Sequence, residues 1–276
     1  MDYEIREMRP DTASGFVKKH HYSPLMPKIT KHWLGLYRDG ALVGVFTLGW
    51  GTRPLHTIKK IVNADMSTDS YLEIGKMCLH QSEPRNSESR ALSLLVKWLK
   101  KNIPDLLFLY TLADGMMGKC GYVYQASNFY YGGSYWTDSY IASDGRKIHP
   151  RTDIELHREN WLWHHSEDSV GYSEAFRDNH SKKVLEYLSG SAEEPPEERV
   201  YWLTPEFQRF KSIRRIRGKM FRYIYPLSKS ARRLLSQSEV QWRLDNYPKD
   251  QDLEWKIMVR DGVYASVSSM PAWYLG

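Results

Sequence analysis

Apolar and polar residues alternate along this chain with two different periods, that of a strand and that of a helix. Residues 71–79 alternate with period two, whereas residues 91–101 place their apolar side chains on one wide helical face. Asp39-Gly40 and Asp144-Gly145 each separate two strand-like runs, as the turn of a β-hairpin does. In chain order, the patterns predict a strand at 3–8, a helix at 11–20 with Asp11 as its N-cap, a hairpin at 34–46, a strand at 71–79, a helix at 91–101, a strand at 106–114, a short helix at 121–128, a strand at 129–135 and a hairpin at 139–149.

The order of these elements predicts the fold class. The strand, helix and strand within residues 71–114 form a βαβ unit, in which the two strands run parallel. The two hairpins add antiparallel strand pairs. We therefore expect an α/β (α+β) fold, in which a mixed sheet carries helices on its faces.

One break in composition predicts how the chain is divided. Residues 189–200 contain four Glu, two adjacent Pro, two Ser and one Gly, a composition that is typical of a linker or an exposed loop. We expect a catalytic core at 1–152, an acidic connecting segment and linker at 153–200, and a basic extension at 201–276.

Charge gathers in the C-terminal part. The 276 residues include 39 Lys and Arg against 33 Asp and Glu, a net charge of +6. The stretch from Pro205 to Leu235 has ten basic residues against Glu206 alone, or +9, so the rest of the chain sums to 6 − 9 = −3. Such local basicity predicts a polyanionic partner. The basic residues are Arg209, Lys211, Arg214, Arg215, Arg217, Lys219, Arg222, Lys229, Arg232 and Arg233.

Aromatic residues, among them Phe210 and Tyr223, are interleaved with these cations. Cations neutralise phosphates, and aromatic rings stack on unpaired bases with about 1–3 kcal/mol per base. We expect DNA contacts here, with a ridge of arginines if the stretch is helical; the alternative is a solvated basic face. The expected DNA-contacting residues of this stretch are Arg214, Arg215, Arg217, Lys219 and Arg222.

Composition also excludes several classes of protein. The longest apolar runs, such as 106–110, are too short to cross a bilayer, and the charged first residues do not form a secretory signal. Two cysteines, Cys78 and Cys120, without a CxxC pair exclude a disulfide scaffold and a cysteine-type zinc module. We therefore expect a cytoplasmic protein with neither a membrane partner nor a metal. No GxGxxG or Walker sequence supports the usual nucleotide sites.

The junction PRNSESR, residues 84–90, joins a strand to the predicted helix. A helix N-terminus presents unpaired N–H groups and the positive end of a dipole, so it can hold a phosphate. Arg85, Ser87, Ser89 and Arg90 add polar side chains, which predicts a cradle for the pyrophosphate of a cofactor. The alternative is a structural N-cap at Asn86 or Ser87 with surface arginines.

Three further positions are candidates for chemistry. Asp114 ends a buried strand, where an α/β sheet usually binds ligands, and could accept a proton or anchor a substrate; the alternative is an N-cap. Tyr124 could protonate a thiolate, because a phenol pKa near 10 suits a thiol near 8.5, although Tyr is also an ordinary half-buried residue. His20, His21 and Tyr22 could contact or stack on a base; the alternative is a histidine favoured by the helix dipole.

Four motifs together resemble a known family. They are HHYS at 20–23, EIGKMCL at 73–79, PRNSESRALSLLVKWLKK at 84–101 and LADGMMGKCGYVYQASNFYYGG at 112–133. In combination they resemble the phage Mom DNA adenine modification family, a divergent branch of the GNAT acyltransferase superfamily. The resemblance covers roughly residues 13–152, about half of the chain.

The resemblance implies a GNAT-like, mostly antiparallel sheet that binds acetyl-CoA or another acyl-CoA in a V-shaped opening between the strands at 71–79 and 106–113. The pyrophosphate would lie on residues 86–90, although the usual glycines of that loop are absent. By motif match, the implied catalytic residues are Lys76, Ser89, Asp114 and Tyr124. The implied cofactor-binding residues are Cys78, Leu79, Arg85, Asn86, Ser87, Glu88, Ser89, Arg90 and Asn128, and His20, His21 and Tyr22 would contact DNA.

The resemblance further implies an enzyme that carbamoylmethylates the exocyclic amine of adenine in double-stranded phage DNA, which protects that DNA from restriction in the host cytoplasm. One alternative keeps the fold and acylates an amine already installed on a hypermodified pyrimidine. Another alternative is a non-catalytic, GNAT-like DNA-binding protein.

Overall fold

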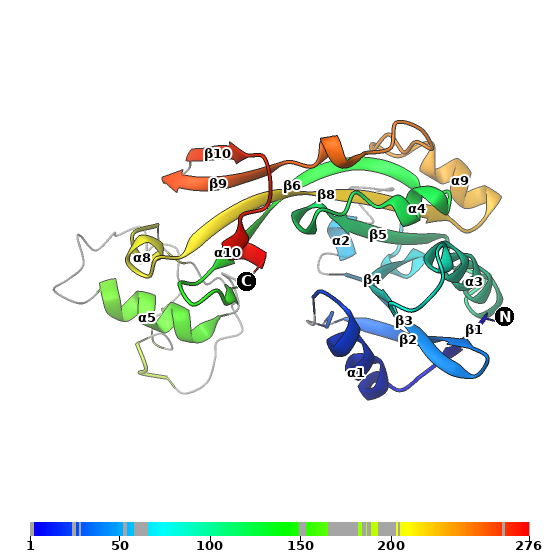
Figure 1. Ribbon diagram of the computed structural model, residues 1–276, viewed down its shortest axis with the longest axis horizontal. Helices are drawn as coiled ribbons and strands as arrows, with labels where there is room; N and C mark the ends of the chain where they lie inside the picture. Colours follow the sequence, from blue (N-terminus) through cyan, green and yellow to red (C-terminus); the bar gives the residue numbers. More distant parts are fainter. Residues whose placement is uncertain are drawn as a thin grey trace. The chain divides into compact units, whose positions relative to one another are not determined.

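The computed structural model describes residues 3–23, 26–27, 29–51, 54–57, 66–148, 153–164, 182–183, 186, 189–192, 203, 205–260 and 263–275. The chain forms two compact units: Met1–Tyr135 with Met220–Leu253, and Trp136–Lys219 with Glu254–Gly276. Strands β6 (Tyr130–Ile141) and β8 (Arg214–Pro226) each continue from one unit into the other (Figure 1). Within the described part, no helix is long and apolar enough to cross a lipid bilayer.

The first unit contains a mixed sheet in the order β1-β2-β3-β4-β5-β8-β6. Strands β4 and β5 are parallel, whereas β1–β2, β2–β3, β3–β4 and β5–β8 are antiparallel. The prediction of a mixed, mostly antiparallel sheet with flanking helices is confirmed. Its elements are β1 (Tyr3–Glu7), α1 (Pro10–His20), β2 (Thr30–Arg38), β3 (Ala41–Gly49), α2 (Pro54–His56), η2 (Thr68–Ser70), β4 (Tyr71–Leu79), α3 (Ser87–Asn102), β5 (Phe108–Asp114), η3 (Gly115–Met117), α4 (Tyr122–Ala126), α9 (Lys229–Leu235) and η4 (Asp250–Asp252), with parts of β6 and β8.

The predicted hairpin around Asp39-Gly40 joins β2 to β3. Arg38 pairs with Ala41, and both turn residues have positive φ, 49° for Asp39 and 84° for Gly40. Glycine adopts this left-handed conformation freely, and Asp is among the residues that tolerate it. The Asp-Gly turn therefore sets the strand register as the sequence predicts.

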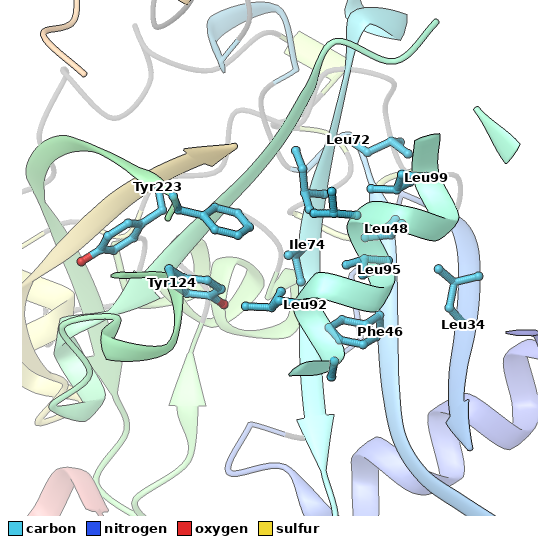
Figure 2. Packing of buried hydrophobic residues seen from close by; sticks show 14 of the residues in the cluster. Leu34, Phe46, Leu48, Leu72, Ile74, Leu92, Leu95, Leu99, Tyr124 and Tyr223 are labelled. Atoms are coloured by element: carbon cyan, nitrogen blue, oxygen red, sulfur yellow. The ribbon is translucent and has the colours of Figure 1, made fainter. Parts of the chain in front are cut away.

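One face of the sheet is covered by α3. Leu92, Leu95 and Leu99 recur at helical spacing on α3 and are fully buried. Figure 2 shows them packed against Phe46 and Ile74 from the strands below. Complete burial of such side chains contributes about 1.5–3 kcal/mol each. The predicted apolar face of the helix at 91–101 is therefore the face that packs against the sheet.

The opposite face carries two other helices. Val17 of α1 packs with Val45 and Cys78 near the β3–β4 pair. Further along the sheet, α9 packs Leu235 against Phe108 and other residues of the β4, β5 and β8 strands. The sheet of the first unit is therefore the middle layer of three.

The second unit has a smaller sheet, with order β7-β6-β8-β9-β10. Tyr140 pairs with Ile148, which confirms the predicted hairpin at 139–149. Phe207, Leu156 and Ile213 form part of a separate apolar cluster. The further elements of this unit are β7 (Lys147–Ile148), α5 (Ile154–His164), α8 (Pro205–Phe210), β9 (Trp255–Arg260), β10 (Val263–Val267) and α10 (Ala272–Leu275).

The division of the chain differs from the one that composition predicts. Residues 220–253 do not form part of a separate extension, because β8 pairs with all seven residues of β5 and so belongs to the first unit. Most of the expected linker, residues 193–200, lies outside the described residues, as does much of 153–192.

Two further local expectations are settled by the structure. Residues 214–226 are a strand, so the arginine ridge that a helical stretch would give does not form; alternate residues such as Ile216 and Gly218 are buried with period two. Helix α1 begins at Pro10 after Arg9, so Asp11 lies in the first turn instead of at the N-cap. Proline is favoured at the first helical position because its missing N–H would have no partner there.

Strand β4 carries a carboxyl group into the protein interior. Glu73 pairs with Gly49 on one side and Tyr110 on the other, and a Cβ at Gly51 would collide with the Glu73 carboxylate. Burial raises the pKa of Glu73 to about 7, because the charged form loses its hydration. Glu73 is therefore largely protonated below pH 7 in the folded protein.

We predict that Glu73→Gln flattens the pH dependence of stability. In the fold the Glu73 carboxyl holds its proton up to about pH 7, whereas its ordinary pKa is 4.5. The free energy of unfolding should therefore fall as the pH rises from about 4.5 to about 7, by up to roughly 3 kcal/mol at 1.36 kcal/mol per pKa unit. Urea unfolding at pH 5 and pH 8 measures this loss, which should be much smaller in Glu73→Gln than in the wild type.

The exposed Glu239 provides a matched control, because Glu239→Gln removes a carboxylate from the protein surface. This control should follow the wild type at both pH values. An equal loss of stability in Glu73→Gln and the wild type would contradict the assignment of the raised pKa to Glu73.

Candidate active site

Strands β4 and β5 separate soon after they pair. Only three residue pairs join them, and the last is Glu73 with Tyr110. Beyond this pair β4 continues to Leu79 and β5 to Asp114, and both strands are described in full without a further pair between them. The two strands therefore part within the ranges 71–79 and 106–113, where the resemblance implied an opening.

A bulge in β4 lies at the same place. Thr47 pairs with Lys76 but the next residue, Leu48, pairs with Ile74, so Gly75 is the extra residue. After the bulge, the side chains of β4 change faces: Ile74 belongs to the core beneath α3, whereas Cys78 packs on the α1 face. The bulge therefore turns Lys76 to the face opposite α3.

A cavity of about 700 Å³ lies at the N-terminal end of α3 in the first unit. Six of the nine residues predicted to bind the cofactor line it: Arg85, Asn86, Ser87, Ser89, Arg90 and Asn128. Three others, Cys78, Leu79 and Glu88, do not line it. The cavity also takes in Ser93, Ser127 and Tyr225, which the sequence did not single out.

The first turn of α3 has no side-chain cap. Asn86 stands at the N-cap and Arg85 and Arg90 are exposed, as the alternative expected, but the Asn86 side chain makes no capping hydrogen bond. The Ser87 N–H donates to the Pro84 carbonyl at 3.1 Å. Ser87 is the first helical residue, and the Ser89 hydroxyl donates to the Asn86 carbonyl at 3.0 Å. Asn86 has a left-handed backbone with φ of 68°, the conformation that glycine would otherwise supply.

Tyr3 also lines the cavity, and the sequence analysis did not single it out. Its hydroxyl donates to Glu83 at 2.6 Å and lies 3.2 Å from the Ser87 hydroxyl. The Arg90 guanidinium is 5.0 Å from the centre of the Tyr3 ring. Glu83 in turn is buried against Arg38 at 3.1 Å. No sequence signal joins Tyr3 to residues more than 80 positions away; only the β1–β2 pairing and the packing of α3 bring them together.

Tyr124 is buried in the core rather than exposed in the cavity. Thr111 donates a hydrogen bond to the Tyr124 hydroxyl at 3.2 Å, and Thr111 directly follows the last residue of β5 that pairs with β4. In Figure 2 the hydroxyl end of Tyr124 lies beside Leu92 of α3. Burial raises the pKa of Tyr124, so the phenol stays protonated at neutral pH and can serve only as a proton donor there.

A polar cluster occupies the face of β4 opposite α3. The Lys76 ammonium donates to the Ser23 carbonyl at 3.0 Å, and the Ser23 N–H donates to His21 Nδ1 at 3.0 Å. Burial lowers the pKa of Lys76, and the charge of Asp114 acts in the opposite direction. Burial and the Lys76 charge lower the pKa of His21 to about 4, so the imidazole is neutral at pH 7. The structure thus brings together residues that were predicted separately for catalysis and DNA contact.

The other two residues of the HHYS motif lie differently. His20 lies 4.6 Å from the Phe16 ring and 4.9 Å from the His80 ring, measured between ring centroids. Tyr22 is 51% exposed and stacks on His21 at 4.3 Å. Among the described residues, no group of three or more His, Cys, Asp or Glu side chains is arranged to hold a metal.

The cations of β8 that were predicted to contact DNA have partners within their own units. Arg215 and Arg217 both bind Asp138, at 2.6 Å and 2.8 Å, and Lys219 pairs with Glu254. Much of the charge expected for DNA is therefore already engaged by carboxylates.

Two other cations of the same strand lie over aromatic rings. Arg214 is 4.4 Å from the Trp273 ring and Arg222 is 4.5 Å from the Tyr135 ring. These contacts leave the positive charge itself unneutralised, since an aromatic ring carries no formal charge.

Comparisons with known proteins bear on the N-terminal part of the chain. A model of the Mom protein family matches residues 2–168. The methylcarbamoylase Mom of Escherichia phage Mu is 33% identical over 155 residues, which cover 54% of this chain and 63% of that protein. The match thus spans slightly less than two thirds of the relative's own length.

Solved structures of acetyltransferases share parts of the fold. AAC(6')-Ib in complex with ribostamycin and coenzyme A matches with a TM-score of 0.36 and 11% identity, over 49% of this chain and 87% of that one. An acetyltransferase of the GNAT family from Streptococcus pneumoniae matches with a TM-score of 0.33 and 13% identity, over 49% and 89% of the two chains. At these scores the likeness adds nothing to the fold described above. The family match over residues 2–168 is the decisive comparison, and by it the chain belongs to the Mom protein family.

Proposed function

We propose that this protein transfers a group from an acyl-CoA to the exocyclic amine of adenine in DNA, as part of carbamoylmethylation that protects phage DNA from restriction. The observation that carries the proposal is the opening between β4 and β5, with an arginine-lined cavity at the α3 N-terminus. The 33% identity to a phage methylcarbamoylase supports it.

The cavity fits the diphosphate of a CoA carrier. Its volume of about 700 Å³ lies within the range of roughly 300–1,000 Å³ that is usual for ligand pockets. Arg85 and Arg90 supply positive charge, and the open first turn of α3 supplies N–H donors and the positive end of the helix dipole. Asn86 adopts the left-handed backbone conformation, so the turn forms without the glycines that are usual in such a loop.

The opposite face of β4 fits the acceptor. Lys76 and His21 lie there together, and Asp114, at the end of β5, is close enough for its charge to oppose the burial that lowers the pKa of Lys76. The adenine amine is hidden in a stacked duplex, so the base must leave the helix to reach this site. Asp114 would orient the amine and accept its proton.

Tyr124 would protonate the leaving group of the same reaction. A bound acyl-CoA would supply a thioester-activated acyl group. Tyr124 is kept protonated by burial and lies next to Thr111, where the two strands part, so it would donate a proton at the thioester sulfur. Transfer from an acetyl thioester forms an amide through the carbonyl carbon and releases the thiol of CoA. A carbamoylmethyl group is bound to the amine through its methylene carbon and carries a second nitrogen, so the complete product requires a nitrogen-containing co-substrate and further bond changes at the methyl carbon.

We predict that replacing both Arg85 and Arg90 by Ala weakens CoA binding at least about tenfold. Charge-assisted hydrogen bonds contribute about 1.5–3 kcal/mol each, and 1.4 kcal/mol corresponds to tenfold in affinity. Titration calorimetry with CoA measures the change. Lys100→Ala and Lys101→Ala, at the other end of α3, should bind CoA as the wild type does. Unchanged affinity in the double arginine variant would place the carrier elsewhere.

We also predict that Asp114→Asn and Tyr124→Phe each lower base modification by roughly 10²-fold or more, the usual loss when a proton-transfer group is removed. Mass spectrometry of nucleosides from DNA co-expressed with each variant measures the product. CoA affinity should stay within about twofold of the wild type, because neither residue lines the cavity. Asp245→Asn, an exposed carboxylate of the same unit, should leave modification unchanged.

The same nucleoside spectra separate the alternatives. An altered adenosine supports the proposal, whereas unaltered adenosine with an altered pyrimidine supports acylation of a hypermodified base. If phage protection, DNA binding and folding all survive in both Asp114→Asn and Tyr124→Phe, the protein is a DNA-binding module and the catalytic assignment fails.

A further inference from the structure

One face of the small sheet in the second unit combines cations with aromatic rings. Along β8, Ile216 and Gly218 are buried, while Arg215, Arg217 and Lys219 are half-buried on the other face. Arg217 pairs with Lys256 of β9, so the two side chains stand on the same face. Tyr264 of β10 is 4.2 Å from the Arg217 guanidinium, measured to its ring centre, and completes this face.

Trp136 is the most exposed ring on that face. Its exposed fraction is 36%, and it ranks among the large hydrophobic side chains that the fold leaves in solvent. The ammonium groups of Lys219 and Lys256 lie 5.6 Å and 4.5 Å from the centre of the Trp136 ring. We call Trp136, Lys219 and Lys256 the Trp136 face.

The charge of this sheet face is positive after its internal ion pairs are counted. Its four cations are Arg215, Arg217, Lys219 and Lys256, and its two carboxylates are Asp138 and Glu254, so the sum is 4 − 2 = +2. Asp138 lies between the two arginines and Glu254 binds Lys219. One unit of this excess remains on Arg215 and Arg217, which share Asp138. The other stands beside Trp136 on Lys256, which forms no ion pair with the described residues.

We propose that the Trp136 face binds a single-stranded stretch of DNA, with one base stacked on the Trp136 ring and a flanking phosphate held by Lys256. The proposal rests on the proposed function, in which a DNA strand must be opened to present its base. An exposed ring beside cations can stack on an unpaired base, whereas a duplex hides the faces of its bases. Lys256 has a long side chain, so its ammonium group can move from the ring to a phosphate as the base arrives.

The proposed base contact at Trp136 draws on residues other than the arginines that the sequence predicted for DNA binding. Arg215 and Arg217 of β8 share Asp138, so one of their two charges is neutralised and both side chains are held by that carboxylate. The residues that carry free charge and a free ring, Lys256 and Trp136, belong to β9 and β6, outside the basic stretch of the sequence.

The test measures binding of fluorescein-labelled oligo(dT) of about 12 nucleotides by anisotropy. Oligo(dT) contains no adenine, so binding is independent of the proposed reaction. Trp136→Ala should weaken binding by roughly 5- to 150-fold, the equivalent of about 1–3 kcal/mol for one stacked base. Trp136→Phe should retain most of the affinity, because it keeps an aromatic face.

Salt dependence tests the phosphate contact of Lys256 separately. Lys256→Ala should flatten the slope of log K against log salt by about 0.7, the value for one phosphate contact with a single strand. Lys100→Ala, an exposed lysine of α3 in the other unit, should change neither the affinity nor the slope. An unchanged slope in Lys256→Ala would overturn the lysine–phosphate contact.

Two results would overturn the stacking contact. One is wild-type affinity of folded Trp136→Ala for oligo(dT); the other is an equal loss for a DNA hairpin duplex, which would indicate phosphate contact alone. The outcome is separable from that of the proposed function. Loss of oligo(dT) binding in Trp136→Ala, together with unaltered adenosine from the wild type, would support the surface and refute the reaction. Altered adenosine from the wild type, together with unchanged oligo(dT) binding in Trp136→Ala, would support the reaction and refute the DNA contact at Trp136.

Discussion

The short parallel pairing of β4 with β5 is the constraint on which the candidate site depends. Each strand is held along its length by an antiparallel partner on the far side, β3 for β4 and β8 for β5. Between them only three pairs form, so the strands part after Glu73 and Tyr110. The backbone hydrogen bonds that fix each strand beyond this point therefore lie on its other edge.

Burial around this opening sets the protonation states that its residues bring to a reaction. Tyr124 keeps its proton, and His21 is neutral because Lys76 and the loss of hydration both disfavour its charged form. Lys76 is itself half-buried, and the nearby Asp114 opposes the loss of its charge. In the proposed transfer to an amine, Tyr124 would be the proton donor and Asp114 the proton acceptor.

The sequence predicts the local elements well and their partners less well. The Asp39-Gly40 hairpin, the strand at 71–79 and the helix with its apolar face at 91–101 are all observed, since each depends on the period and the turn residues of one short segment. The sequence left the secondary structure of 214–226 open, because charge dominates the pattern of that stretch. It is a strand of the first sheet because its apolar residues pack beside β5.

The amino-acid sequence by itself determined the mixed fold, the family and the polar residues at the start of α3, because these depend on periodicity and on motifs that are contiguous in the chain. Only the tertiary structure decided which of those residues meet. It placed Tyr3 in the cavity wall and His21 beside Lys76, and it engaged Arg215 and Arg217 with Asp138. The physical reason is that strand pairing and burial join residues far apart in the chain, and a one-dimensional pattern of charge does not record which carboxylate a cation will meet.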